Sequence, residues 1–153
     1  MSRPIKFRGK VLEGMLSVDK YVNSWIYGDL SHLGDDFCIS SIDSEEQIEN
    51  PELIIPTMQV DPATVGQFTG LSDKNGKEIY EGDRLKCKCK KRPLAMPPRG
   101  KQKYVYKEAL VEWWSSSCAH GYRLKFKHGT MMAKQGGLNT MEVEVIGNIH
   151  EDK

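Results

Sequence analysis

Alternating apolar and polar positions in the second half of the chain predict β-strands. In residues 84–90 (RLKCKCK) every second side chain is apolar and its neighbours are basic, so a strand there has one apolar and one basic face. The same period of two runs through 122–127 (YRLKFK) and 141–145 (MEVEV). Aromatic and β-branched residues favour a further strand over 104–114 (YVYKEALVEWW). If basic and acidic strands are neighbours, each cross-strand pair of opposite charges stabilises the sheet by roughly 0.2–1 kcal/mol.

Turn signals separate these strands. The tetrapeptide DKNG (73–76) predicts a hairpin between strands at 68–71 and 77–80, with Asn75 and Gly76 at positive φ. The tripeptide EGD (81–83) predicts a second reversal just before the basic strand. Three prolines and a glycine in 91–101 (KRPLAMPPRGK) interrupt the sheet, because proline cannot donate a ladder hydrogen bond. We therefore expect a basic, proline-rich loop at about 91–103.

Helix signals are few and short. A capping box begins at Ser44, but Pro51 ends any helix there within two turns. Asp61 and Pro62 predict a single turn through Val65. Residues 135–140 (QGGLNT) lack the spacing of a phosphate-binding loop and predict a flexible loop. Short strand candidates lie at 5–8 and 25–29.

The predicted fold is mainly β, with short helical turns. A length of 153 residues suits one domain covering 1–153. A GD turn, a basic loop and a return strand ending in VEWW follow the layout of small SH3-like barrels, which is a likeness of fold alone. We therefore expect either a small SH3-like barrel or a bent antiparallel sheet.

Composition predicts a cytoplasmic protein. No apolar run approaches the roughly 20 residues of a membrane-spanning helix, and the start (MSRPIKFRGK) has no apolar stretch typical of an export signal. The four cysteines are expected to be reduced thiols in such a compartment.

The formal net charge of +1 conceals two blocks of opposite charge. Residues 21–73 contain no lysine or arginine and ten acids: Asp29, Asp35, Asp36, Asp43, Glu45, Glu46, Glu49, Glu52, Asp61 and Asp73. Residues 84–107 contain no acid and ten bases: Arg84, Lys86, Lys88, Lys90, Lys91, Arg92, Arg99, Lys101, Lys103 and Lys107. Charge blocks of this kind inform on partners and solubility rather than on fold.

Two binding functions follow from the blocks, beside the simpler interpretation of a solvated surface. The basic block of one copy can meet the acidic block of another, which predicts a homo-oligomeric interaction protein. Alternatively, segment 84–107 binds nucleic acid, because lysines neutralise phosphates and nearby aromatic rings stack on bases. Trp113 and Trp114 are consecutive in a predicted strand, so one of the two should be exposed. The candidate contact residues are Arg84, Lys86, Lys88, Lys90, Lys91, Arg92, Arg99, Lys101, Lys103 and Trp114.

The sharpest chemical alternative is a zinc site made of Cys87, Cys89, Cys118 and His120. Residues two apart on a strand have Cα atoms roughly 6.6 Å apart, whereas tetrahedral zinc holds its sulfurs within about 3.8 Å. Thiols packed in a core are therefore the favoured interpretation. No acid, base and nucleophile converge in the sequence, so we expect no enzyme, no cofactor, no metal and no small-molecule substrate.

Several motifs together resemble one known family. They are IKFRGK (5–10), WIYGDL (25–30), VDPATVGQFTGLSDKNGKEIYEGD (60–83), VEWW (111–114) and EVIGNIHE (144–151). In this order they are similar to the YopX-like proteins of bacteriophages and prophages. The resemblance implies a mainly β fold, a phage or prophage setting in a bacterial host, and no catalytic residues to carry over. The segment 84–103 lies outside these motifs.

Overall fold

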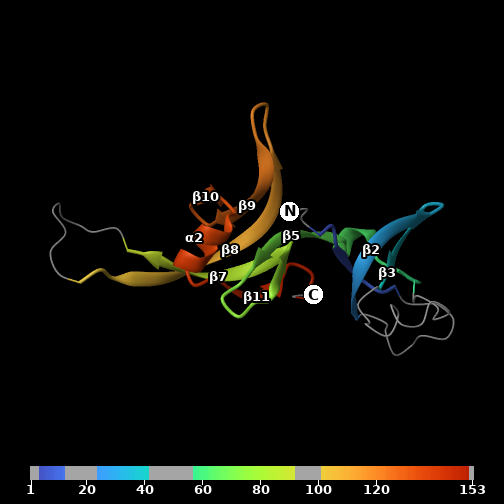
Figure 1. Cartoon of the computed structure of the whole chain (residues 1–153), viewed down its shortest axis with the longest axis horizontal. Coiled ribbons are helices and arrows are strands. Elements are labelled where there is room, and N and C mark those ends of the chain that lie inside the picture. The colour runs from blue at the N-terminus through green and yellow to red at the C-terminus, as the bar shows by residue number, and fades with distance from the viewer. Residues whose placement is uncertain (1–3, 13–23, 42–56, 92–100, 152–153) are drawn as a thin grey trace. The chain divides into compact units, whose positions relative to one another are not determined.

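The computed structural model describes residues 4–12, 24–41, 57–91 and 101–151. It divides into two compact units, Met1–Gly70 and Leu71–Lys153 (Figure 1). The described residues form antiparallel strands with one short α-helix and no closed barrel. A mainly β fold is therefore confirmed, in the form of bent sheets rather than a barrel. That 1–153 is a single domain stays a prediction.

The first unit is an antiparallel sheet in the order β4-β3-β2-β1-β5. Its strands are β1 (Phe7–Lys10), β2 (Trp25–Leu33), β3 (Asp36–Ser40), β4 (Thr57–Gln59) and β5 (Gly66–Ser72), the last of which continues into the second unit. Val11, Ile26, Ile39, Met58 and Val60 form its buried core. The predicted single turn is confirmed as η2 (Pro62–Thr64), where Asp61 accepts a hydrogen bond from the Ala63 amide.

The second unit contains a five-stranded antiparallel sheet in the order β10-β9-β8-β7-β11. Its elements are β6 (Glu78–Tyr80), β7 (Asp83–Lys90), β8 (Tyr104–Ser115), β9 (His120–Phe126), β10 (Gly129–Met132), α2 (Gln135–Thr140) and β11 (Glu144–Asn148). The alternation predicted in 84–90 is confirmed, because Leu85 and Cys87 are fully buried while Lys86 is exposed. Leu124 and Val143 complete the centre of this core.

Two predicted turns are present, and their aspartates hold them closed. Asp73 accepts hydrogen bonds from the amides of Asn75 and Lys77, and Gly76 takes a φ of 82°. Of the two residues predicted at positive φ in this turn, only the glycine has it. In the second turn the Tyr80 amide donates to Asp83.

The prediction of a flexible loop at 135–140 was wrong, since these residues form α2. Tertiary contacts override the low helix propensity of the glycine pair. Leu138 is buried in the core, and the Gln135 side-chain amide exchanges two hydrogen bonds with the Ser72 backbone. The predicted helix start at Ser44 and the central part of the predicted basic loop, 92–100, lie outside the described residues.

Candidate functional site

The longest strand of the second unit, β8, builds a hairpin that carries most of the basic block. β7 and β8 pair from Arg84 opposite Leu110 to Lys90 opposite Tyr104, and the Lys91 amide donates to the Lys103 carbonyl one step farther out. In Figure 1 the outer end of this hairpin extends away from the other strands of its unit. We call residues 86–91 and 101–107 the arm.

One face of the arm combines lysines with exposed tyrosines. Lys88 pairs with Tyr106 and Lys90 with Tyr104 across the ladder, so their side chains share a face. The exposed fractions of Tyr104 and Tyr106 are 49% and 64%, respectively. The Lys86 ammonium lies 4.8 Å from the Tyr106 ring centroid, and that of Lys88 lies 5.1 Å from the Tyr104 centroid. We call Lys86, Lys88, Lys90, Tyr104 and Tyr106 the tyrosine–lysine face.

Acids of the same unit pair with one lysine of this face and with the arginine that precedes it on β7. Arg84 forms an ion pair with Glu108 at 3.1 Å, and Lys88 forms one with Glu142. The hydrogen bond to Glu142 raises the pKa of Lys88 above its ordinary value. On the adjacent β11, Glu144 pairs with Lys74 at 2.6 Å, and this hydrogen bond lowers the pKa of Glu144. Arg84 and Lys88 are therefore engaged within their own chain.

The outer end of the arm keeps its positive charge. Lys90, Lys91, Lys101 and Lys103 are exposed, and they make no ion pair with any residue that the structure describes. The candidates Arg92 and Arg99 lie outside the described residues. The remaining basic candidates all lie on this one hairpin, namely Arg84, Lys86, Lys88, Lys90, Lys91, Lys101 and Lys103.

The tryptophan pair lies toward the other end of β8. Trp113 is 47% exposed and meets Tyr122 edge-on at 5.1 Å between ring centroids. Trp114 is half-buried, with the Arg123 guanidinium 5.6 Å from its ring centroid. One tryptophan is thus markedly exposed, and it is Trp113 rather than the candidate Trp114. Neither residue belongs to the tyrosine–lysine face.

The four residues of the zinc alternative are not brought together. Cys87 is buried, Cys89 is half-buried, and Cys118 and His120 are exposed at the β8–β9 turn. Burial raises the pKa of the Cys87 thiol to about 12, with a smaller contribution from Cys89, so this thiol stays protonated. Within the described part of the chain, no group of three or more His, Cys, Asp or Glu side chains is arranged to hold a metal ion.

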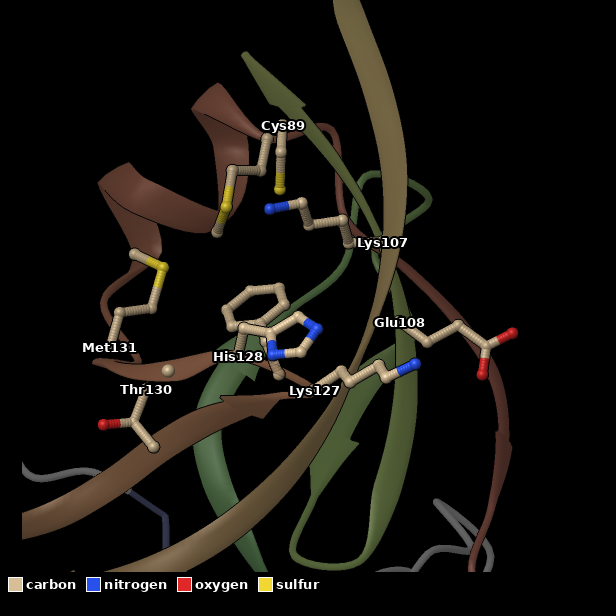
Figure 2. A pocket seen from close by; sticks show the side chains of 10 residues that line it. Cys89, Lys107, Glu108, Lys127, His128, Thr130 and Met131 are labelled. Atoms are coloured by element: carbon tan, nitrogen blue, oxygen red, sulfur yellow. The ribbon is translucent and has the colours of Figure 1, made fainter. Parts of the chain in front are cut away.

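The opposite face of the arm borders a pocket of about 630 Å³ (Figure 2). Its walls come from β7, β8, the β9–β10 hairpin with its turn, and the residue after α2, namely Cys89, Lys107, Glu108, Phe126, Lys127, His128, Gly129, Thr130, Met131 and Met141. Sequence reasoning missed this pocket. Phe126, Met131 and Met141 are ordinary apolar residues on separate elements, and no motif links them.

Charged side chains around the pocket point in different directions. Figure 2 shows the Lys107 ammonium reaching inward toward Cys89, whereas the Glu108 carboxylate and the Lys127 ammonium point away. The orientation of Glu108 agrees with its ion pair to Arg84. In this view the His128 ring lies between the side chains of Lys107 and Lys127. Among the residues that line the pocket, Lys107 therefore brings a positive charge to a largely apolar interior.

Two acids of the acidic block serve the fold of their own chain, and five others lie outside the described residues, namely Asp43, Glu45, Glu46, Glu49 and Glu52. Asp61 caps η2, and Asp73 accepts hydrogen bonds from three backbone amides, those of Asn75, Lys77 and Val145. Asp35 and Asp36 are exposed at the turn between β2 and β3. No helix among the described residues is long and apolar enough to cross a membrane.

Comparisons with known proteins extend over both units. A family model described as YopX protein matches residues 17–153. The chain is also similar to a solved structure titled "Crystal structure of protein EF1440 from Enterococcus faecalis", with 20% sequence identity and a TM-score of 0.48, over 99% of this chain and 96% of that one. No curated protein matches the chain. The family match covers all of the second unit and most of the first.

Proposed function

The chain belongs to the YopX family, and we propose that it binds single-stranded nucleic acid through the outer end of the β7–β8 arm. The observation that carries this proposal is the pair of exposed rings, Tyr104 and Tyr106, on the hairpin whose outer lysines make no ion pair with any described residue.

The two groups have complementary tasks in such a complex. An exposed tyrosine ring stacks on an unpaired base, and each stacked base contributes roughly 1–3 kcal/mol. Lys90, Lys91, Lys101 and Lys103 provide ammonium groups for phosphates, whose neutralisation releases counterions. A duplex hides its base faces within the stack, so the tyrosines favour single strands.

Fluorescence anisotropy with a labelled oligothymidylate of about 20 nucleotides tests the proposal. We expect binding at about 50 mM salt that weakens steeply as salt rises, with a slope of log K against log salt of about −3 for four phosphate contacts. A duplex of the same length should bind more weakly. Tyr104→Ser combined with Tyr106→Ser should lower the affinity for the single strand at least tenfold.

Variants that remove the same charge at different places test whether binding depends on the lysines of the arm or only on the total positive charge of the protein. Lys101→Gln with Lys103→Gln should weaken binding and reduce the salt slope. Lys127→Gln with Lys134→Gln removes the same charge from exposed positions outside the arm and should leave binding unchanged. The proposal fails if no binding occurs at about 50 mM salt, or if both pairs of lysine variants behave alike.

Self-association is the second candidate function, favoured by the acids at the β2–β3 turn. Asp35 and Asp36 are exposed and make no ion pair with described residues, so they offer opposite charge to the arm of a second copy. We expect Asp35→Asn with Asp36→Asn to lower any oligomer mass measured at low salt. A wild-type chain that is monomeric at low salt and micromolar concentration contradicts this candidate.

Neither candidate requires catalysis, and we propose a non-enzymatic binding protein. The phage or prophage setting implied by the family resemblance, and a location in the host cytoplasm, stay predictions. A nucleic-acid partner is compatible with the phage or prophage setting and with the cytoplasmic location.

A further inference from the structure

We infer that the pocket beside β10 binds a small organic anion whose apolar body fills the interior while its carboxylate or sulfonate meets Lys107. This site lies on the face of the arm opposite the tyrosine–lysine face, so it does not depend on the proposed nucleic-acid binding.

The interior of the pocket suits an apolar ligand. Phe126, Met131 and Met141 supply an aromatic ring and two flexible thioethers, and Cys89 adds a thiol that is half-buried. Methionine side chains adapt to ligands of irregular shape and make favourable contacts with aromatic rings. A volume of about 630 Å³ falls within the range typical of small-molecule sites, about 300–1,000 Å³.

The charge of the pocket selects an anion. Lys107 extends its ammonium group into the interior, and it makes no ion pair with any described residue. The nearest carboxylate in the sequence, Glu108, points to the opposite face and pairs with Arg84. A carboxylate or sulfonate entering the pocket thus meets a cation that this acid does not neutralise. A charge-assisted hydrogen bond of this kind is stronger than one between neutral groups.

The position of Lys107 allows its role to be tested apart from that of the lysines on the tyrosine–lysine face and of Lys127. It follows Tyr106 on β8, so its side chain lies on the other face of the strand. Lys127 also borders the pocket, but its ammonium group points away from it. Lys127 is therefore the matched control, since it has the same charge and a similar exposed setting.

Two naphthalene dyes that differ in charge test the inference on the full chain. 8-Anilinonaphthalene-1-sulfonate is the anionic probe, and N-phenyl-1-naphthylamine has the same ring system without the sulfonate. We expect fluorescence enhancement with saturable one-to-one binding of the anionic dye, and displacement of that dye by decanoate. Lys107→Met should raise the Kd of the anionic dye at least tenfold and change the Kd of the neutral dye by less than twofold. Lys127→Met should leave the Kd of both dyes unchanged.

Methionine NMR locates the bound dye. With ¹³C-methyl-labelled methionine, the signals of Met131 and Met141 should shift on titration while that of Met58, in the core of the first unit, stays in place. Assignment by Met131→Leu and Met141→Leu also shows whether these variants keep the fold.

Defined outcomes overturn the inference. The inference fails if the wild-type chain binds neither dye, or if Lys107→Met and Lys127→Met lower the affinity for the anionic dye equally. It also fails if the methyl signals of Met131 and Met141 do not shift when the dye is added. Loss of dye binding in Tyr104→Ser with Tyr106→Ser, but not in Lys107→Met, places the dye on the tyrosine–lysine face and refutes the pocket. Binding of an oligonucleotide without displacement of the dye supports two separate sites.

Discussion

Asp73 shows how one carboxylate organises a turn and the strand next to it. Its oxygens accept hydrogen bonds from the amides of Asn75 (2.8 Å), Lys77 (3.0 Å) and Val145 (3.1 Å), and the residue is buried. Burial alone would raise the pKa of this carboxyl, but the three hydrogen bonds together with the charge of Lys77 outweigh it and lower the pKa. The ionised form is thus the one that the fold requires.

Asp73→Asn should lower the free energy of unfolding by about 1–3 kcal/mol at pH 7, because an amide group then faces the Val145 amide donor. Since the folded pKa lies below the ordinary value of 3.8, this contribution is present above that pH and is lost as pH falls below it. The difference between wild type and variant should therefore narrow toward pH 3. Urea unfolding followed by tryptophan fluorescence measures it.

The exposed turn acid Asp35 provides the control, and Asp35→Asn should change stability by less than about 0.5 kcal/mol. A difference in free energy of unfolding between wild type and Asp73→Asn that stays constant from pH 7 to pH 3 would contradict the role given to the ionised carboxylate.

Gly28 illustrates a position where only glycine fits. Its φ is 156°, and a Cβ there would lie 1.9 Å from the Ser40 carbonyl oxygen, which belongs to the backbone of β3. Gly28→Ala should destabilise the first unit by about 3 kcal/mol, the upper end of the usual cost of overpacking, since the two strands must separate. Gly34→Ala, in open space at a φ of 68°, should cost only the strain of that conformation, about 1 kcal/mol. Equal losses in urea unfolding would contradict this explanation.

Among the secondary-structure elements, α2 is a helix that its own sequence disfavours. Gly136 lies inside it without a positive φ, and a methyl group added at its Cα would meet no heavy atom within 4 Å. Gly136→Ala should therefore stabilise the second unit by about 0.5–1 kcal/mol. Gly76→Ala, also in open space but at a φ of 82°, should destabilise it. Thermal unfolding of the two variants measures both effects. A lower Tm for Gly136→Ala would contradict a helix at this position.

Strands with a regular period were predictable, and elements held by distant contacts were not. The alternation in 84–90 follows from one buried face, so local sequence was enough to identify β7. β3, β4 and β10 are short and carry no clear alternation, and α2 depends on the burial of Leu138 and on bonds to Ser72. The lysines of the arm were visible as a charge block, whereas the pocket arises only where β7, β8, the β9–β10 hairpin and Met141 meet.

At the scale of the whole molecule, the described residues separate opposite charges only in part. Acids on β8 and just before β11 neutralise the base of the arm, while the outer end of the arm stays positive among the described residues. Asp61 and Asp73, predicted as part of an acidic binding surface, instead hold turns of their own chain. This distribution favours an external polyanion as the partner over a fully complementary second copy.

Light scattering at low salt, with and without a single-stranded oligonucleotide, distinguishes these two partners in one experiment. We expect the mass of one chain for the protein alone, and the mass of a chain–oligonucleotide complex when the strand is added. A stable oligomer whose mass the oligonucleotide leaves unchanged would contradict binding of nucleic acid by the arm.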